Sequence, residues 1–273
     1  MKLVQPLRQL LEISGVSDVL LIGPNNTHIF DGSWQSVANP FRTAEKLREQ
    51  ILGLVIESGE RWDIAKPYVD FSFGNYRFHA LMAGAVASED QLSIRVHREL
   101  DEFELDPKLR LIAESNDSFL ISGVTGSGKT TLLSEMLKVS PGRTVLVEQT
   151  PEIELSPPSV TLRSRRANIE GAGELTLSEL LDQALRMRPD RIAIGEIRGR
   201  EIISLLIAIN NGHKGAAATV HAASPASVKA RLKTLGLIAG VKEELVTDLS
   251  KGLDWLIHVE KTKLQGIYRW ADL

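Results

Sequence analysis

The segment Gly123-Val-Thr-Gly-Ser-Gly-Lys-Thr-Thr131 decides the fold of this 273-residue chain. Its spacing, G-x-x-x-x-G-K-T, is that of a phosphate-binding loop, with an apolar stretch before it and a predicted helix over 129–137 after it. The glycines let the main chain turn tightly enough for its N–H groups to face a phosphate, and the helix N-terminus adds its positive dipole end. The alternative is a glycine-rich turn that binds nothing, and the flanking strand and helix weigh against it.

The loop predicts a nucleotide site. We expect Lys129 to reach the β- and γ-phosphate oxygens and the Thr130 hydroxyl to ligate Mg²⁺. The sequence has no Asn-Lys-x-Asp motif for reading guanine, so ATP and Mg²⁺ are the predicted ligands. The predicted nucleotide-binding residues are Gly123, Val124, Thr125, Gly126, Ser127, Gly128, Lys129, Thr130 and Thr131.

Downstream of the loop, predicted strands and helices alternate as in a doubly wound parallel sheet. The strands cover 144–147, 191–194 and 216–220, and the helices cover 177–187 and 201–210. Upstream, the pattern is that of an α+β domain, with helices over 3–13 and 44–58 and strands over 18–22, near Phe71, over 77–81 and over 92–96. We therefore predict an α/β fold: a C-terminal RecA-like P-loop NTPase domain with a smaller α+β N-terminal domain.

An acidic stretch at 99–107 predicts the boundary between these domains. We expect an N-terminal domain over 1–98, a linker over 99–108 and an ATPase domain over 109–273. Residues 1–108 hold 11 basic and 16 acidic side chains, a net charge of −5, and residues 109–273 hold 21 and 19, a net charge of +2. The two halves would therefore attract each other, within one chain or between neighbouring copies.

The composition excludes several classes of protein. Hydrophobic residues make up 43% and charged residues 25%, which excludes a disordered tail and a coiled coil. The chain has no cysteine, which excludes disulfides and thiolate metal sites. We expect no export signal at the N-terminus, because charged residues interrupt its apolar pattern, and the longest apolar stretch is well short of the ~20 residues that cross a bilayer. We expect a cytoplasmic protein with no transmembrane segment, which docks at the membrane if it acts there.

Acidic residues follow two of the predicted strands. Glu196 ends the strand over 191–195, Glu148 ends the strand over 144–147, and Glu152 comes four residues later. A P-loop hydrolase needs a carboxylate near Mg²⁺ and a group that positions the attacking water, and parallel strands present their C-terminal residues to one crevice. Glu196 is our first choice for the carboxylate, bound to Mg²⁺ directly or through water. The alternative for each of the three is a solvated surface carboxylate.

Histidines and arginines give weaker signals. His213 and His221 flank a short apolar strand, where either could contact the γ-phosphate or be an ordinary hydrogen-bonded histidine; their spacing does not match a zinc site. Arg77 and Arg95 lie in predicted strands of the N-terminal half and, taken alone, are surface arginines. The arginine-rich segment 163–200 has no interleaved aromatic residues for stacking bases, which disfavours a nucleic-acid groove.

Several blocks, in order, resemble the secretion and pilus-assembly ATPases of the type II/type IV superfamily, nearest to the tight-adherence pilus ATPase branch. GVTGSGKTT resembles the Walker A motif, VEQTPEI the aspartate box, LTLSELLDQALRMRPDRIAIGEIRGRE the Walker B block with Glu for the usual Asp, and GHKGAAATVHAASP the histidine box. SDVLLIG and GNYRFHALMAG with LSIRVH resemble the N-terminal domain of the same proteins. The resemblance covers almost the whole chain.

The resemblance implies roles for the weaker signals. Glu196 would be the Walker B carboxylate, Glu148 the water-positioning acid and Glu152 its second acid. The other implied catalytic residues are His213 and His221 near the γ-phosphate, and Arg77 and Arg95 reaching the phosphates from the N-terminal domain. The resemblance also implies a homohexamer, peripheral to the inner membrane, that couples MgATP hydrolysis to pilus assembly or protein secretion. Its expected partner is an inner-membrane platform protein, and no nucleic acid is expected.

Two departures from the family pattern leave alternatives open. Gln149 stands where the aspartate box usually has Asp, and LMAGAV replaces a proline-containing turn after the Arg77 strand. One alternative, which the Gln149 change leaves open, is a nucleotide-gated scaffold with little turnover. A separate alternative is a RecA-like nucleic-acid translocase, since the P-loop alone does not exclude it. The residues do not distinguish extension, retraction and secretion.

Overall fold

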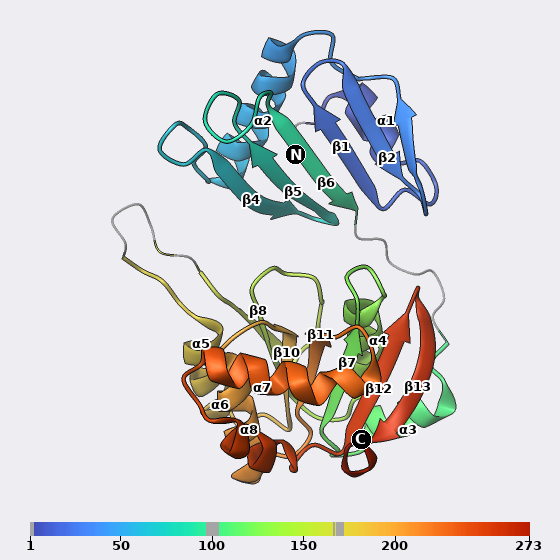
Figure 1. The fold of residues 1–273 in the computed structure, drawn as a ribbon, viewed down its shortest axis with the longest axis vertical. Coiled ribbons are helices and arrows are strands. Elements are labelled where there is room, and N and C mark those ends of the chain that lie inside the picture. The colour runs from blue at the N-terminus through green and yellow to red at the C-terminus, as the bar shows by residue number, and fades with distance from the viewer. Residues whose placement is uncertain (1–2, 97–103, 166, 168–171) are drawn as a thin grey trace. The chain divides into compact units, whose positions relative to one another are not determined.

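The computed structural model describes residues 3–96, 104–165, 167 and 172–273, and the chain divides into two units, Met1–Asp101 and Glu102–Leu273 (Figure 1). Each unit has its own sheet and its own hydrophobic core. Part of the expected linker, 99–103, lies outside the described residues. The last two residues of the expected linker, 107 and 108, belong to helix α3 (Pro107–Glu114). The helix begins there because the Asp106 side chain accepts a hydrogen bond from its first turn and proline suits that turn.

The N-terminal unit contains a six-stranded antiparallel sheet with the strand order β3-β2-β1-β6-β5-β4. Its strands are β1 (Asp18–Ile22), β2 (Asn26–Phe30), β3 (Trp34–Val37), β4 (Tyr68–Phe73), β5 (Tyr76–Leu81) and β6 (Gln91–Val96). Its helices are α1 (Gln5–Leu11) and α2 (Ala44–Ser58).

The two faces of this sheet differ in polarity because side chains alternate along each strand. Val19 and Leu21 of β1 face the core, where α2 contributes Leu47 and Ile51, four residues apart on one side of the helix. The opposite face carries polar side chains, such as Asp18 on the same strand. This half-buried pattern matches the predicted α+β domain.

The C-terminal unit contains a seven-stranded sheet with the order β13-β12-β7-β11-β10-β8-β9, in which only β13 is antiparallel to its neighbour. Its strands are β7 (Phe119–Gly123), β8 (Thr144–Glu148), β9 (Val160–Arg163), β10 (Arg191–Ile197), β11 (Ala217–His221), β12 (Trp255–Glu260) and β13 (Lys263–Arg269). Besides α3, its helices are α4 (Lys129–Val139), α5 (Leu177–Leu185), α6 (Glu201–Asn210), α7 (Val228–Ile238) and α8 (Glu243–Ser250), with short turns of 3₁₀-helix η1 (Pro225–Ser227) and η2 (Trp270–Asp272).

Helices cover both faces of this sheet, so every residue of β7 and β8 and all but the last residue of β11 are buried. Helices α3 and α4 pack on one face and α5 to α8 on the other (Figure 1). Neighbouring residues of β8 show the alternation: Leu146 joins the core under α4, whereas Val145 and Val147 join the core under α5 and α6. The structure confirms the predicted α/β class with a parallel sheet.

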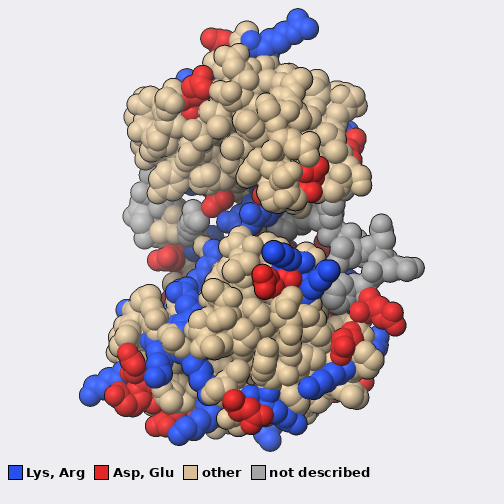
Figure 2. All heavy atoms as spheres, turned by 45° about the vertical axis from the view of Figure 1, so that its right-hand side comes forward, with Lys and Arg blue, Asp and Glu red and all other residues tan. Residues whose placement is uncertain are grey.

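The surface of the C-terminal unit is rich in charged side chains. Figure 2 shows Lys and Arg over this unit, interspersed with Asp and Glu, whereas the same view of the N-terminal unit is mostly uncharged. The longest helix among the described residues, α2, has 15 residues, and no described helix is both long and apolar enough to cross a membrane.

Arg191 ties the amino-terminal edge of the sheet together from inside the protein. Its guanidinium donates to the main-chain oxygens of Gly215 at 2.8 Å, Ala113 at 3.1 Å and Ser115 at 2.6 Å. The side chain is buried, and burial lowers the pKa of Arg191 to about 10. These bonds join β10 to the chain segments that lead into β7 and β11.

We expect Arg191→Lys to destabilise the C-terminal unit by on the order of 2 kcal/mol, because an ammonium cannot reach all of these oxygens and leaves buried acceptors unpaired. Denaturant unfolding measures this change. Arg186→Lys, on an exposed arginine at the end of α5, is the matched control and should stay within about 0.5 kcal/mol of the wild type. Equal stability of the two variants would contradict a structural role for Arg191.

Candidate active site

The loop between β7 and α4 has a backbone that only glycine allows at its two ends. Gly123 has φ +156°, and a Cβ there would lie 2.2 Å from the main-chain oxygen of Val259 on β12 and 2.5 Å from the Ser127 hydroxyl. Gly128, the residue just before α4, has φ +87°. The loop is therefore pressed against β12, and its main chain is held in the shape that the motif predicted.

The loop also carries polar groups suited to an anion. Lys129 is only 6% exposed, and its Nζ donates to the main-chain oxygen of Val124 at 2.7 Å, across the loop. Burial lowers the pKa of Lys129, and the carboxylates of Glu196 and Glu152 oppose that shift. The Ser127 hydroxyl is buried without a hydrogen-bond partner among the described residues. A buried ammonium and an unpaired hydroxyl beside a helix N-terminus fit a bound phosphate chain.

Glu196, near the end of β10, is the centre of a row of polar side chains at the carboxyl edge of the sheet. One of its oxygens lies 2.5 Å from His221 Nε2, and the other accepts from Arg198 Nε at 2.7 Å. Arg198 in turn donates to Gln149 Oε1 at 3.3 Å. The row thus connects residues at the ends of β8, β10 and β11.

His221 lies directly beside the phosphate-binding loop. It is the last residue of β11, and in the sheet register it pairs with Gly123, the first glycine of the loop. Burial lowers the pKa of His221 and the neighbouring Lys129 ammonium lowers it further, while the Glu196 carboxylate opposes both. His221 therefore lies between the loop and Glu196.

Glu148 ends β8 in a buried position, with 2% of its surface exposed. Gly195 of the neighbouring strand makes room for it, since a Cβ at 195 would lie 3.0 Å from the Glu148 Cγ. The Glu152 N–H donates to both carboxylate oxygens at 3.4 Å. Burial raises the pKa of Glu148 to about 7, so this carboxyl group exchanges protons near neutral pH.

Comparisons with known proteins show which family the chain belongs to. Residues 90–259, more than half of the chain, match the family described as "Type II/IV secretion system protein". The chain belongs to this family. It is a P-loop ATPase of the secretion-system type.

Its relatives include conjugation proteins. A "Putative conjugal transfer protein" of Mycobacterium tuberculosis is 38% identical over 291 residues, which cover 98% of this chain and 82% of that protein. The "Probable conjugal transfer protein TrbB" of Sinorhizobium fredii is 26% identical over 272 residues, covering 92% of this chain and 81% of the relative.

Solved structures of the superfamily share the fold. The pilus retraction motor PilT with bound ADP matches 94% of this chain and 78% of its own, at 19% identity and a TM-score of 0.63. The VirB11 ATPase of the Brucella suis type IV secretion system matches 97% of this chain and 95% of its own, at 21% identity and a TM-score of 0.52. The fold class predicted from the sequence is therefore confirmed.

The structure brings together most of the predicted residues of the C-terminal unit, and it separates one. Lys129, Glu196, Glu148 and His221 lie at the carboxyl edge of the sheet, as described above. His213 lies in the turn between α6 and β11, at the opposite edge of the sheet. Its main-chain N–H donates to the main-chain oxygen of Ala208 in α6. This position does not support the expected contact of His213 with the γ-phosphate.

Arg77 and Arg95 belong to the N-terminal unit. They face each other across β5 and β6, and each has an acidic partner on a neighbouring strand: Asp70 lies 3.5 Å from Arg77, and Asp18 lies 3.1 Å from Arg95. The two arginines therefore share the face of the sheet opposite the helices. Their contact with a nucleotide stays a prediction.

Two features of the site were not predicted. The first is that Arg198 donates a hydrogen bond to the Glu196 carboxylate. Its position in GEIRGRE, two residues after the glutamate, could have indicated this contact. The turn between β12 and β13 lies against the loop, with Thr262 Cα 3.6 Å from the position of a Cβ on Gly128. No motif in the sequence marks this turn.

The raised pKa of Glu148 gives a prediction for stability. The folded state holds this proton more tightly than the unfolded state, so its contribution to stability is complete below about pH 4.5 and is lost as the pH rises through about 7. Glu148→Gln keeps the neutral shape at all pH values. At pH 5 the free energy of unfolding of the variant should therefore be close to that of the wild type. At pH 8 it should exceed that of the wild type by on the order of 3 kcal/mol.

Denaturant unfolding at the two pH values measures this difference, and steady-state ATP hydrolysis of the same variant should be strongly reduced. Glu154→Gln, on an exposed carboxylate of the same segment, is the control and should show neither effect. A pH-independent difference between Glu148→Gln and the wild type would contradict the buried, proton-exchanging state of Glu148.

Proposed function

We propose that this chain is the ATPase of an inner-membrane machine for conjugation, pilus assembly or protein secretion, and that it works in the cytoplasm as a homohexameric ring. The observation that carries the proposal is the convergence of Lys129, His221, Glu196 and Glu148 on one edge of the sheet, in a chain of this family. The names of the relatives support a transfer or secretion machine. They are not specific to the tight-adherence branch, which stays a prediction.

The residues at the carboxyl edge divide the work of hydrolysis. Lys129 and the main-chain N–H groups of the loop bind the phosphates, and the Thr130 hydroxyl and Glu196 would hold Mg²⁺. When bound, Mg²⁺ neutralises charge on the phosphate oxygens. Glu148, with a pKa of about 7, orients the attacking water and accepts its proton, while Glu152 fixes the Glu148 carboxylate through its N–H.

Three further side chains, His221, Arg77 and Arg95, stabilise the charge that develops during hydrolysis. His221 lies beside the first glycine of the loop and donates toward the γ-phosphate side of the site. Arg77 and Arg95 act from the N-terminal unit of the same or a neighbouring copy, in the manner of arginine fingers, which are worth about 10³ to 10⁵ in rate. The opposite net charges of the two halves favour a ring in which units of different copies meet.

Phosphate release from MgATP, measured across a range of protein concentrations with light scattering on the same samples, tests the proposal. We expect turnover per chain to rise as a ring of six forms. Lys129→Ala should abolish nucleotide binding or turnover, and Glu196→Gln should leave binding intact while slowing hydrolysis by on the order of 10²-fold or more. Lys138→Ala, on the exposed far end of α4, is the control and should behave as the wild type.

The outcomes separate this proposal from its alternatives. A Glu196→Gln enzyme that runs at full speed would contradict the site. Tight ATP binding without phosphate release in any assembly state would favour a nucleotide-gated scaffold. Stimulation of turnover by DNA or RNA would favour a nucleic-acid translocase.

Arg198 gives a separate prediction about Mg²⁺. Its guanidinium occupies one oxygen of Glu196 and orients the carboxylate, so a divalent cation has to compete with it. In Arg198→Ala we expect half-maximal activity at a lower Mg²⁺ concentration and a kcat reduced by roughly tenfold, since Glu196 is accessible but no longer oriented. A Mg²⁺ titration at fixed ATP measures both.

Arg200→Ala is the matched control, because this exposed arginine lies two residues further along, at the start of α6. It should leave the Mg²⁺ titration and the kcat unchanged. If Arg198→Ala behaved in the same way, Arg198 would have no part in positioning Glu196.

A further inference from the structure

The β12–β13 hairpin runs beside the phosphate-binding loop from the loop's first glycine to its last. Strand β12 pairs in parallel with β7 as far as His258, which lies opposite the last residue before the loop. The main-chain oxygen of the next residue, Val259, lies 2.2 Å from the position of a Cβ on Gly123. The turn of the hairpin then reaches the other end of the loop, where Thr262 Cα is 3.6 Å from the position of a Cβ on Gly128.

A buried pair of side chains joins the hairpin to β7 where the loop begins. His258 is 4% exposed, and its Nδ1 lies 2.9 Å from the hydroxyl of Ser122, which is fully buried. Burial lowers the pKa of His258, the Glu260 carboxylate opposes this shift and the Lys129 ammonium adds to it, so the ring is neutral at neutral pH. A buried imidazole costs free energy unless it is hydrogen-bonded. The bond to Ser122 meets this need and fixes β12 to β7 directly before Gly123.

The hairpin has an irregular shape where it passes the loop. The register of β12 and β13 shifts between His258 and Val259, as in a β-bulge, which bends a hairpin. Lys261 and Thr262 form the turn with φ +49° and +62°, the left-handed region that a β-branched residue such as threonine rarely adopts. Backbone strain of this kind persists where the surrounding structure imposes the shape. Here the bent and strained part of the hairpin is the part that lies against Gly128.

We propose that this hairpin positions the phosphate-binding loop from outside the nucleotide site, and that His258 is its positioning residue. The bond between His258 and Ser122 fixes β12, which places the Val259 oxygen against the start of the loop. The turn limits the movement of the other end, just before α4. The N–H groups of the loop are thus held in the arrangement that binds phosphate before a ligand arrives, which reduces the cost of binding. The proposal rests on phosphate binding by the loop, one part of the proposed function, and on neither the ring nor the membrane machine.

Two substitutions of His258 test its role by calorimetric titration of the full chain. His258→Leu removes the bond to Ser122, whereas His258→Asn places an amide group where Nδ1 was and can keep the bond. His258→Leu should weaken the binding of MgADP and of inorganic tripolyphosphate by the same factor, about fivefold to tenfold. The factor is the same because tripolyphosphate has no nucleoside and meets only the loop. His258→Asn should bind both ligands within about twofold of the wild type.

Ser122→Ala completes a double-mutant cycle on this bond. It should weaken the binding of both ligands as much as His258→Leu does. The double variant Ser122→Ala/His258→Leu should bind no more weakly than either single variant, because both substitutions remove one interaction. Effects that multiply would mean that the two residues act independently, which would contradict the proposal.

Thr262 tests the turn from an exposed position, where a substitution leaves the core intact. Thr262→Pro cannot adopt a positive φ, so it should displace the turn and weaken the binding of both ligands. Thr262→Gly adopts this φ freely and should retain the affinities of the wild type. This pair decides the role of the hairpin even if His258→Leu does not fold.

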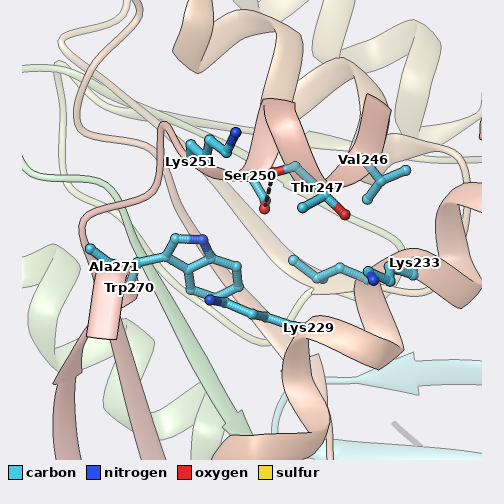
Figure 3. Close-up of a pocket in the computed structure, with 9 residues that line it drawn as sticks. Lys229, Lys233, Val246, Thr247, Ser250, Lys251, Trp270 and Ala271 are labelled. Carbon is cyan, nitrogen blue, oxygen red and sulfur yellow. Dashed lines mark hydrogen bonds between the residues drawn. The ribbon is translucent and has the colours of Figure 1, made fainter. Parts of the chain in front are cut away.

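Amide hydrogen exchange of the ligand-free protein separates positioning from a general loss of stability. In His258→Leu the main-chain amides of the loop should exchange about fivefold to tenfold faster than in the wild type. The control is Val246→Ala, in the core beside a cavity that α7, α8 and η2 line (Figure 3). It should lower the melting temperature while leaving the exchange of the loop and both affinities unchanged.

The proposal is overturned if a folded His258→Leu or Thr262→Pro variant binds both ligands as the wild type does. It is also overturned if the loss is confined to MgADP, which would mean that the hairpin contacts the nucleoside, or if Val246→Ala loosens the loop to the same extent. Hydrogen exchange is measured without ligand, and none of these results depends on turnover. The proposed function and the role of the hairpin can therefore fail separately.

Discussion

The parallel register of β7, β11, β10 and β8 is the constraint on which the site depends. Parallel strands present their carboxyl ends at one edge, and here the order of the strands places β11 between the phosphate-binding loop and the strand that carries Glu196. His221 is the last residue of β11, so the register alone puts an imidazole between Gly123 and Glu196. A site of this kind needs no long loops to assemble it, since the main-chain hydrogen bonds of the sheet fix the spacing.

The electrostatics of this edge follow from burying several charges together. Lys129 is buried near Glu196 and Glu152, and Glu196 is shared between His221 and Arg198. Each of these charges has a partner, which is the condition for keeping it ionised away from water. Glu148 is the exception: burial is the largest influence on it and outweighs the opposing effects of main-chain N–H groups and of Arg163, so it holds its proton up to about pH 7. The site therefore combines fixed charges that bind with one group free to accept a proton.

The sequence predicted the parts of the structure that depend on local pattern. The loop, the alternation of strands and helices after it, and the acids at strand ends all follow from spacing over a few residues. The sequence did not predict the contribution of β12 and β13. The pairing of β12 with β7 joins segments more than 130 residues apart, and no local pattern indicates it. The contact of His213 with the γ-phosphate stays a prediction. The structure places His213 and His221 at opposite edges of the sheet, because the residues between them span the length of a strand.

Arg191, which begins β10, and Arg198, which directly follows it, show why residue type alone could not predict their roles. Arg191 and Arg198 are seven residues apart in an arginine-rich segment, and the sequence offers no ground for treating them differently. The direction of the strand separates them. Arg191 begins β10 at the amino edge, where it is buried and donates to main-chain oxygens of two other segments, so its guanidinium holds the unit together. Arg198 leaves the strand at the carboxyl edge, where it is exposed and meets a carboxylate, so it bears on the chemistry of Glu196 instead. In a parallel sheet, the edge at which a charged residue lies decides whether it serves stability or function.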